Sequence, residues 1–256
     1  MQEGATSSLP GVAVINGASR GIGFEAAANL ARQGWNIAIT ARKANSLEES
    51  AAALRALGVE ILALPGAVDD PDHQQATIDA VMARWNRIDA LVNNVATSPH
   101  LGNLSEATAD QMARAMAVNL IAPFSWSRLV WHAFMGQHGG SIVNVTSIGG
   151  TYPVPRVGLY NISKAALIHL TRQLALEMAP GVRVNGVAPA TVKTRFSRAK
   201  YEGREQEVAD QYPLKRLGTA EEVGDVIAML CTGRLGWMTG QNVVLDGGAS
   251  IIQGVV

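Results

Sequence analysis

Short apolar runs alternate along this chain with longer stretches in which apolar residues recur every three or four positions. The apolar runs occupy residues 11–15, 35–40, 60–68, 88–96, 141–145, 182–189 and 241–248. Short runs bounded by glycine, proline or polar residues are typical of buried strands, and the stretches between them are typical of helices. Their alternation predicts a doubly wound α/β fold of seven parallel strands, with right-handed crossovers and helices on both faces of the sheet.

Two of the intervening helices carry more detailed predictions. The helix after the second strand is expected to begin after Ser46, because Glu49 lies three residues on and would complete a capping box. A long helix is expected over residues 109–120 and should continue beyond Pro123. Asn119 lies inside it, although asparagine is a poor residue for a helix interior. It is either a polar residue that kinks the helix near a site or an ordinary surface residue.

The segment at residues 190–215 is polar, mixed in charge and interrupts the apolar pattern. We expect it to form a mobile lid with short helical pieces, followed by a regular helix over residues 220–231. The basic residues of the lid are Lys193, Arg195, Arg198, Lys200 and Arg204. They would either contact an anionic substrate or form a solvated face.

Length and composition fit one compact domain. The chain has 256 residues, of which 48% are hydrophobic and 16% charged, and its formal net charge is zero. We expect a flexible lead-in at residues 1–10 and a single domain over residues 11–256. The charge balance argues against nucleic acid as the main partner. Cys231 is the single cysteine, so a disulfide framework and a cysteine-rich metal site are excluded, and burial as a small hydrophobe is expected.

Membrane and secretory signals are not found in the sequence. No apolar run approaches 18 residues, which argues against a membrane-spanning helix. The lead-in lacks the charged and apolar regions of a signal peptide. We therefore expect a cytoplasmic protein with no metal site and no membrane partner.

A glycine-rich turn follows the first predicted strand and opens a helix. Gly17, Gly21 and Gly23 give the spacing G-x-x-x-G-x-G. In this context, glycines let the backbone turn tightly and let a pyrophosphate approach the amides at a helix N-terminus. Ordinary tight turns also need glycine, but strand, turn and helix together predict dinucleotide binding.

The end of the second strand predicts which dinucleotide is bound. An acidic residue there would hold the 2′-hydroxyl of the ribose in NAD. This chain has Thr40, Ala41 and Arg42 instead. Arg42 and Arg20 would bind a 2′-phosphate through charge-assisted hydrogen bonds, so we expect NADP(H) rather than NAD(H). The alternative is two ordinary surface arginines.

Tyr160 and Lys164 are the main candidates for catalysis. They lie four residues apart at the start of a predicted helix, so both project from one face. A cation beside a phenol favours the phenolate and lowers its pKa, which would make Tyr160 an acid–base catalyst. Ser147 follows a predicted strand and would hydrogen-bond a carbonyl oxygen that Tyr160 protonates. Alternatively, Tyr160 and Lys164 are an ordinary solvated surface pair.

Asn93 and Asn94 lie at the carboxyl end of another predicted strand, where ligands of open α/β sheets bind. The alternative is that they only form a turn.

Taken together, the sequence resembles the short-chain dehydrogenase/reductase family from about Gly11 to Gly248. The resemblance rests on G-A-S-R-G-I-G at 17–23, I-D-A-L-V-N-N at 88–94, Asn119 in V-N-L, Ser147, Y-N-I-S-K at 160–164, V-N-G-V-A-P at 184–189 and T-G-Q-N-V-V-L-D-G-G at 239–248. Among its members, the 3-oxoacyl-carrier-protein reductases look most similar.

The resemblance implies a single Rossmann-like domain, commonly a homotetramer, that transfers hydride between a nicotinamide and a carbonyl or alcohol. It implies that Tyr160 is the acid–base, that Ser147 steadies the substrate oxygen, that Lys164 binds the nicotinamide ribose, and that Asn119 anchors a water in a proton relay. The cofactor-binding positions that it implies, together with those already named, are Gly17, Ser19, Arg20, Gly21, Ile22, Gly23, Arg42, Val68, Asn94, Tyr160, Lys164, Pro189 and Thr194.

Four positions depart from the family pattern. Asn16 stands where threonine usually opens the glycine turn, and Ala67 stands where an aspartate usually meets the adenine. Ala96 and Ala190 replace glycines, so their methyl groups would crowd backbone that normally passes close to the cofactor. These changes bear on cofactor affinity and leave the four catalytic positions intact.

The sequence therefore supports an NADPH-dependent ketone reductase for a small carbonyl or alcohol substrate. The alternatives are a 3-oxoacyl thioester reductase and a catalytically silent nucleotide-binding protein. We expect a substrate pocket lined by residues near 97–104, 148–157 and 190–212, including Tyr152, Pro153 and Phe196. Self-association would bury the apolar faces of the helices at 109–135 and 160–178.

Overall fold

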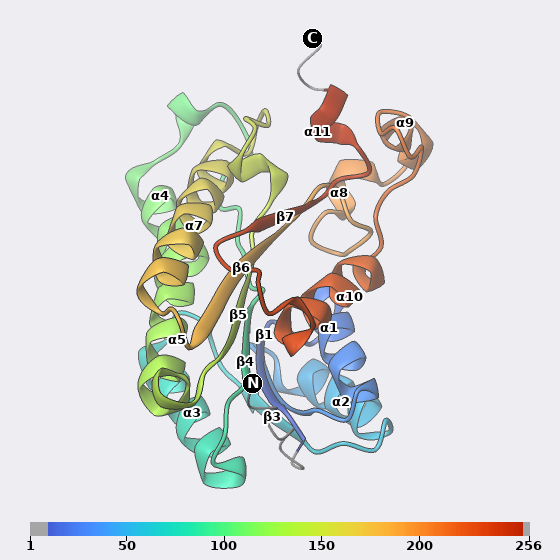
Figure 1. The fold of residues 1–256 in the computed structure, drawn as a ribbon. Helices are drawn as coiled ribbons and strands as arrows, with labels where there is room; N and C mark the ends of the chain where they lie inside the picture. The colour runs from blue at the N-terminus through green and yellow to red at the C-terminus, as the bar shows by residue number, and fades with distance from the viewer. Residues whose placement is uncertain (1–9, 253–256) are drawn as a thin grey trace.

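A single seven-stranded parallel sheet forms the centre of the molecule (Figure 1). The structure is a computed structural model, and it describes residues 10–252. The predicted lead-in therefore lies outside the described residues, apart from Pro10. The strands are β1 Val12–Asn16, β2 Asn36–Ala41, β3 Ile61–Pro65, β4 Ala90–Asn93, β5 Gly140–Val145, β6 Val182–Pro189 and β7 Asn242–Leu245. Their order is β3-β2-β1-β4-β5-β6-β7, which confirms the predicted doubly wound fold.

Helices cover both faces of the sheet, as the alternation predicted. The longer ones are α1 Gly21–Arg32, α2 Ala44–Arg55, α3 Pro71–Trp85, α4 Ala109–Met116, α5 Ala122–Val130, α7 Gly158–Glu177 and α10 Ala220–Cys231. Short pieces are α6 Gly136–His138, α8 Arg198–Tyr201, α9 Glu205–Ala209 and α11 Ala249–Ile252. Helices α1, α2 and α10 lie on one face, and α3, α4, α5 and α7 lie on the other (Figure 1). No helix of the described part of the chain is long and apolar enough to cross a membrane.

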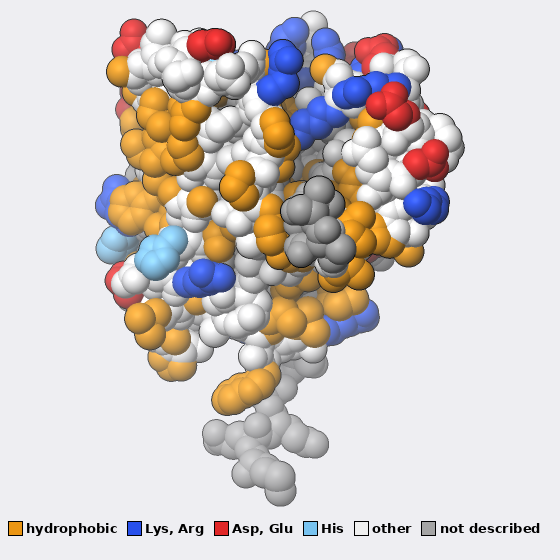
Figure 2. All heavy atoms as spheres, turned by 90° about the horizontal axis from the view of Figure 1, so that it is seen from above, with side chains coloured by type: hydrophobic (Ala, Val, Ile, Leu, Met, Phe, Trp, Pro, Cys, Tyr) orange, Lys and Arg blue, Asp and Glu red, His pale blue; other side chains and the backbone are white. Residues whose placement is uncertain are grey.

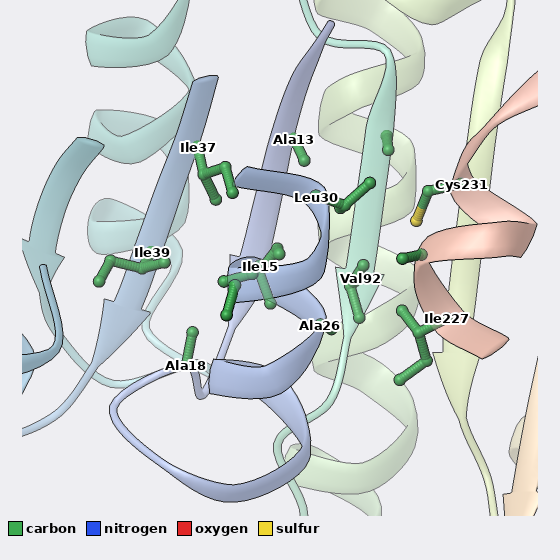
Figure 3. Close-up of a cluster of buried hydrophobic side chains, with 14 of the residues drawn as sticks. Ala13, Ile15, Ala18, Ala26, Leu30, Ile37, Ile39, Val92, Ile227 and Cys231 are labelled. Carbon is green, nitrogen blue, oxygen red and sulfur yellow. The ribbon is translucent and has the colours of Figure 1, made fainter. Parts of the chain in front are cut away.

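A core of small and branched side chains lies between the sheet and helices α1 and α10 (Figure 3). Helix α10 packs closely on α1 because Gly224 has no side chain, and a Cβ there would lie 2.8 Å from the backbone of Ala26. Cys231, at the end of α10, belongs to this core, as predicted. Burial raises the pKa of its thiol to about 12, which suits a packing role and not a nucleophile.

One helix start differs from its prediction. Helix α2 begins at Ala44 and not after Ser46, and no side chain caps it. The Ser46 hydroxyl donates to the carbonyl oxygen of Lys43 at 3.2 Å, so the expected capping box with Glu49 is wrong. Real capping boxes occur at the starts of α4 and α10, where Thr108 and Thr219 cap the helices.

The long helix predicted from residue 109 onwards is present but irregular. A turn of π-helix over Ala117–Ile121 separates α4 from α5 and contains Asn119. Single π-turns are often found at functional sites. Asn119 is fully buried, so the surface alternative is wrong. In α5, Phe124 is 46% exposed. Self-association through the helix faces at 109–135 and 160–178 stays a prediction.

Polar side chains form a buried chain of hydrogen bonds across the middle of the sheet. Thr40 donates to Asn16 at 3.0 Å, Asn16 to Asn93 at 3.2 Å, and Asn93 to Asn144 at 2.9 Å. Asn144 then donates to the hydroxyl of Thr171 in α7, also at 2.9 Å. We call these five residues the asparagine ladder. It explains Asn16 at a position where the family usually has threonine, because Asn16 links β1 to both of its neighbours.

Candidate active site

A groove with a cavity volume of about 350 Å³ lies at the carboxyl ends of the parallel strands. Ligands of open α/β sheets bind in this position. Its lining residues come from the turn after β1, the ends of β2 to β6 and the start of the lid. Figure 2 views this end of the molecule and shows lysine and arginine side chains gathered on one part of it.

The glycine turn is built as the sequence predicts. Gly17 and Gly21 have φ values of +71° and +59°, a conformation that favours glycine. The side-chain amide of Asn94 donates to the carbonyl oxygens of Asn16 and Gly17 at 3.2 and 3.1 Å and so fixes the turn. A Cβ on Gly23 would lie 2.6 Å from the carbonyl oxygen of Gly17. Gly23 therefore lies behind the turn and does not line the groove, unlike the other predicted cofactor positions.

The N-terminus of α1 is a suitable site for a pyrophosphate. The helix begins at Gly21, its N-cap residue Arg20 makes no side-chain cap, and its first turn has no acidic residue. Its first amides therefore have no side-chain acceptor and can bind an anion. Ser19, Arg20, Gly21 and Ile22 all line the groove here. The residues present thus fit the phosphates of a dinucleotide.

The adenosine end of the groove is cationic. Arg42 and Lys43 follow β2, line the groove and are exposed, and neither forms an ion pair with a described residue. Arg42 and Arg20 were predicted from the sequence, whereas Lys43 was not, although it follows Arg42 directly. None of the lining residues contributed by β2 is acidic, so this strand end offers no carboxylate to a ribose 2′-hydroxyl.

Asp69 is the one carboxylate among the described lining residues. It pairs with Arg114 of α4, which also lines the groove. Neither residue was singled out from the sequence, where Asp69 is one of two consecutive aspartates. Ala67 does not line the groove, whereas Val68 does, as predicted. The carbonyl oxygen of Val68 is fixed by the Trp126 indole and by the side-chain amide of Gln74.

Ser147, Tyr160 and Lys164 meet at the other end of the groove. Ser147 follows β5, and its hydroxyl accepts from the amide of Gly149 at 3.1 Å and hydrogen-bonds Tyr160. Tyr160 and Lys164 lie in the first two turns of α7. The Lys164 ammonium donates to the carbonyl oxygen of Val145 at 2.6 Å and lies 5.7 Å from the centre of the Tyr160 ring. All three line the groove, so the predicted convergence is present.

The expected lowering of the Tyr160 pKa by Lys164 is wrong for this structure. Burial raises the pKa of the phenol to about 12, although the hydrogen bond with Ser147 acts in the opposite direction. Burial also lowers the pKa of Lys164 to about 7. The charged form of Lys164 is therefore only partly populated at neutral pH, and desolvation decides the state of both groups.

Asn119 lies beneath this site and does not line the groove. Its side chain exchanges two hydrogen bonds of 2.8 Å with the backbone of Thr97. It also donates to the hydroxyl of Ser163 at 2.9 Å, and that hydroxyl donates to the backbone carbonyl of Tyr160 at 2.7 Å. Asn119 thus ties the loop after β4 to the helix turn that carries Tyr160.

The start of the predicted lid closes one side of the groove. Thr194 faces the glycine turn, because a Cβ on Gly21 would lie 3.5 Å from the Thr194 methyl. The Phe196 ring lies against the Tyr160 ring, with centroids 5.9 Å apart. Pro189 and Ala190 also line this side. Of the apolar residues predicted for the substrate pocket, Phe196 is at the groove, and Tyr152 and Pro153 are not.

No metal-binding cluster of three or more His, Cys, Asp or Glu side chains occurs within residues 10–252. The site therefore consists of an anion-binding turn, cationic side chains at both ends, and a serine, tyrosine and lysine beside the lid. Such a set can hold a dinucleotide and move a proton to or from an oxygen atom.

Comparison with known proteins agrees with this arrangement. A family model described as "Enoyl-(Acyl carrier protein) reductase" matches residues 17–250. Dehydrogenase/reductase SDR family member 4 of Mus musculus is 32% identical over 240 residues, which cover 93% of this chain and 86% of that protein.

Two solved structures show the same fold. L-Sorbose reductase from Gluconobacter frateurii, complexed with NADPH and L-sorbose, superposes with a TM-score of 0.88 at 29% identity, covering 94% of this chain and 96% of that chain. NAD⁺-bound xylitol dehydrogenase superposes with a TM-score of 0.86 at 29% identity, covering 93% of this chain and 98% of that chain. With this sheet, this glycine turn and a family match over nearly its whole length, the chain belongs to the short-chain dehydrogenase/reductase family and is an oxidoreductase of alcohol or carbonyl groups.

Proposed function

We propose that this protein is an NADPH-dependent reductase of small or medium-sized carbonyl compounds. One observation carries the proposal: Ser147, Tyr160 and Lys164 line the same groove as a glycine turn that fits a dinucleotide. The reductase of known structure with NADPH and L-sorbose supports the same class of reaction. When bound, the nicotinamide supplies the hydride that reduces the carbonyl carbon.

The chain's own residues hold the substrate oxygen and deliver the proton. The Ser147 hydroxyl accepts from Gly149 and hydrogen-bonds Tyr160. It would turn its hydrogen to a carbonyl oxygen placed beside both side chains. Tyr160 gives the proton to that oxygen. With a pKa of about 12, the phenol is fully protonated at neutral pH.

Lys164 and Asn119 have supporting roles in this proposal. The buried Lys164 is placed by its hydrogen bond to Val145 and would bind the ribose next to the nicotinamide. Asn119 acts through Ser163 on the backbone of Tyr160 and fixes where the phenol lies. The water-anchoring role that the family resemblance implies for Asn119 remains a prediction.

A second candidate is reduction of a 3-oxoacyl thioester. The matching family model is named for a reductase of a different acyl-carrier-protein thioester, an enoyl one, so it supports the carrier-bound class of substrate and not the 3-oxo group. NADPH consumption is measured with a panel of ketones, aldehydes, polyol-derived ketoses and oxoacyl thioesters. Turnover of free carbonyl compounds supports the proposal, and turnover restricted to thioesters replaces it by the second candidate. If NADPH binds and none of the panel reacts, the silent nucleotide-binding alternative gains support.

The cofactor preference gives a separate prediction. Arg42→Asp should weaken NADPH binding by about 10- to 100-fold, because a charge-assisted hydrogen bond to the 2′-phosphate is replaced by repulsion. NADH binding should change little. Fluorescence titration with each dinucleotide measures both affinities. Arg32→Asp is the matched control, because Arg32 is exposed at the far end of α1 and does not line the groove. An equal effect on NADPH and NADH would contradict a 2′-phosphate site at Arg42.

A further inference from the structure

The five basic residues of the lid do not have equal surroundings. Lys193 pairs with Glu205, Arg198 pairs with Glu202 at 2.5 Å, and Arg204 pairs with Glu207 at 3.6 Å. Every one of these glutamates belongs to the lid itself. Three of the five positive charges are therefore neutralised locally, as the solvated-face interpretation requires. Arg195 and Lys200 are different.

Arg195 and Lys200 line the groove and form no ion pair with any residue from Pro10 to Ile252. Lys200 keeps an exposed surface, yet the protein around it desolvates its ammonium group and lowers its pKa. A cation in this position has lost part of its hydration without gaining an anionic partner. That cost is recovered when an anion binds.

The backbone that carries these two cations is tied together by local hydrogen bonds beside the groove. Ser197 is buried, and its hydroxyl donates to the carbonyl oxygen of Val192. The Tyr201 hydroxyl approaches the carbonyl oxygen of Thr194 at 3.4 Å. These hydrogen bonds join residues before Arg195 to residues on either side of Lys200. The Cα atoms of Arg195 and Lys200 therefore lie in a hydrogen-bonded segment.

The position of this segment indicates what Arg195 and Lys200 bind. Phe196, between them in sequence, lies against the Tyr160 ring, so the segment borders the place where a carbonyl would meet the proton donor. In the proposed function, the phosphates of the cofactor would be bound by the α1 N-terminus and by Arg20 and Arg42, which also line the groove. In the groove, Asp69 is paired with Arg114 at the adenosine end, so it does not neutralise the cations beside the lid.

We propose that Arg195 and Lys200 bind an anionic group of the substrate, a carboxylate or a phosphate, and that the natural substrate is an acidic carbonyl compound. Phe196 provides an apolar surface for the body of that substrate. This inference rests on the proposed reductase function and makes its substrate class more specific. It also separates this chain from an enzyme whose substrate is an uncharged sugar or polyol.

The test compares oxo acids with their neutral esters. The substrates are 4-oxopentanoate and 5-oxohexanoate and the methyl ester of each, assayed by NADPH consumption, with binding to the NADP⁺-loaded protein measured by calorimetry. The wild-type protein should bind and reduce the acids better than the esters. Arg195→Gln and Lys200→Gln should each lower affinity and kcat/KM for the acids by about 10- to 100-fold and leave the ester values within about twofold.

Arg198→Gln is the matched control, because Arg198 lies in the same segment but pairs with Glu202 and does not line the groove. It should leave all values unchanged. Equal binding of acids and esters by the wild-type protein overturns the inference, even if the esters are reduced and the reductase proposal stands. A loss of NADPH affinity in the Arg195 and Lys200 variants, equal for all substrates, also overturns it and assigns the two cations to the cofactor. Since calorimetry needs no turnover, preferential binding of the acids supports the inference even if the proposed reaction fails.

Discussion

Replacing Tyr160 by phenylalanine should abolish most carbonyl reduction while leaving NADPH binding nearly intact. The substitution removes the phenolic hydroxyl, which is the proton donor, and keeps the ring that packs against Phe196. A positioned acid–base group contributes about 10²- to 10⁴-fold to the rate, and we expect a loss of kcat in that range. Steady-state kinetics and fluorescence titration on the same preparation measure the two quantities.

Tyr152→Phe is the control for this experiment. Tyr152 is 37% exposed and does not line the groove, so its hydroxyl should not matter. If Tyr160→Phe retained more than about a tenth of the wild-type kcat, Tyr160 would not be the proton donor. If NADPH affinity fell in parallel with kcat, the hydroxyl would serve binding and not chemistry.

Replacing Lys164 by methionine should eliminate turnover and, at the same time, stabilise the folded protein. Lys164 is 1% exposed, and burial lowers its pKa to about 7, so the fold disfavours the charged form. Methionine fills the same space without a charge. Replacing buried ion pairs by apolar residues of similar volume stabilises some proteins by about 1–4 kcal/mol. We expect a smaller gain from the single charge of Lys164, because the loss of the bond to Val145 offsets part of it.

The sign of the pH dependence follows from the lowered pKa. Between about pH 7 and the ordinary value of 10.5, the unfolded chain binds more protons at Lys164 than the folded chain does. The wild-type contribution to stability therefore rises with pH through this window. The gain in free energy of unfolding from Lys164→Met should be largest below pH 7 and should shrink as the pH rises above it.

Urea unfolding at pH 6.5 and pH 9 measures this difference. Lys43→Met serves as the control, because Lys43 is exposed. Its replacement should leave the difference in stability from wild type the same at both pH values. A Lys164→Met protein that is less stable than wild type at the lower pH would show that the buried ammonium is satisfied in the fold. The stability argument would then be wrong, whatever the effect on turnover.

Much of the fold follows from the apolar pattern. All seven strands arise from the seven apolar runs, and α10 has the predicted bounds of residues 220–231. The start of α2 could not be predicted in the same way, because Ser46 bonds the backbone of Lys43 instead of capping the helix. Competing local hydrogen bonds of similar strength decide such boundaries, and sequence spacing does not rank them.

The sequence predicted where the site residues lie better than it predicted their protonation and ion pairing. The positions of Ser147, Tyr160 and Lys164 followed from strand ends and helical spacing. The pKa of Tyr160 did not, because i to i+4 spacing indicates a neighbouring charge but not the burial that outweighs it. Ion pairing on the lid was only partly visible: Arg198 and Glu202 are four residues apart and can pair locally, but the sequence does not show that Lys193 meets Glu205 or that Arg195 meets no acid among residues 10–252. The burial of Tyr160 and the surroundings of Arg195 both depend on tertiary contacts.

The asparagine ladder has a consequence for how the strands align during folding. Strands buried on both faces are apolar throughout, so sliding one past its neighbour by a single residue would still bury apolar side chains. The ladder removes that tolerance. In the native alignment Asn16 lies opposite Thr40, and Asn93 lies opposite Asn144. A slip of one residue would turn an amide to the opposite face and leave several buried polar groups unpaired, at about 1–3 kcal/mol each. Three asparagines and a threonine thus set the alignment of four strands that their hydrophobic neighbours leave open.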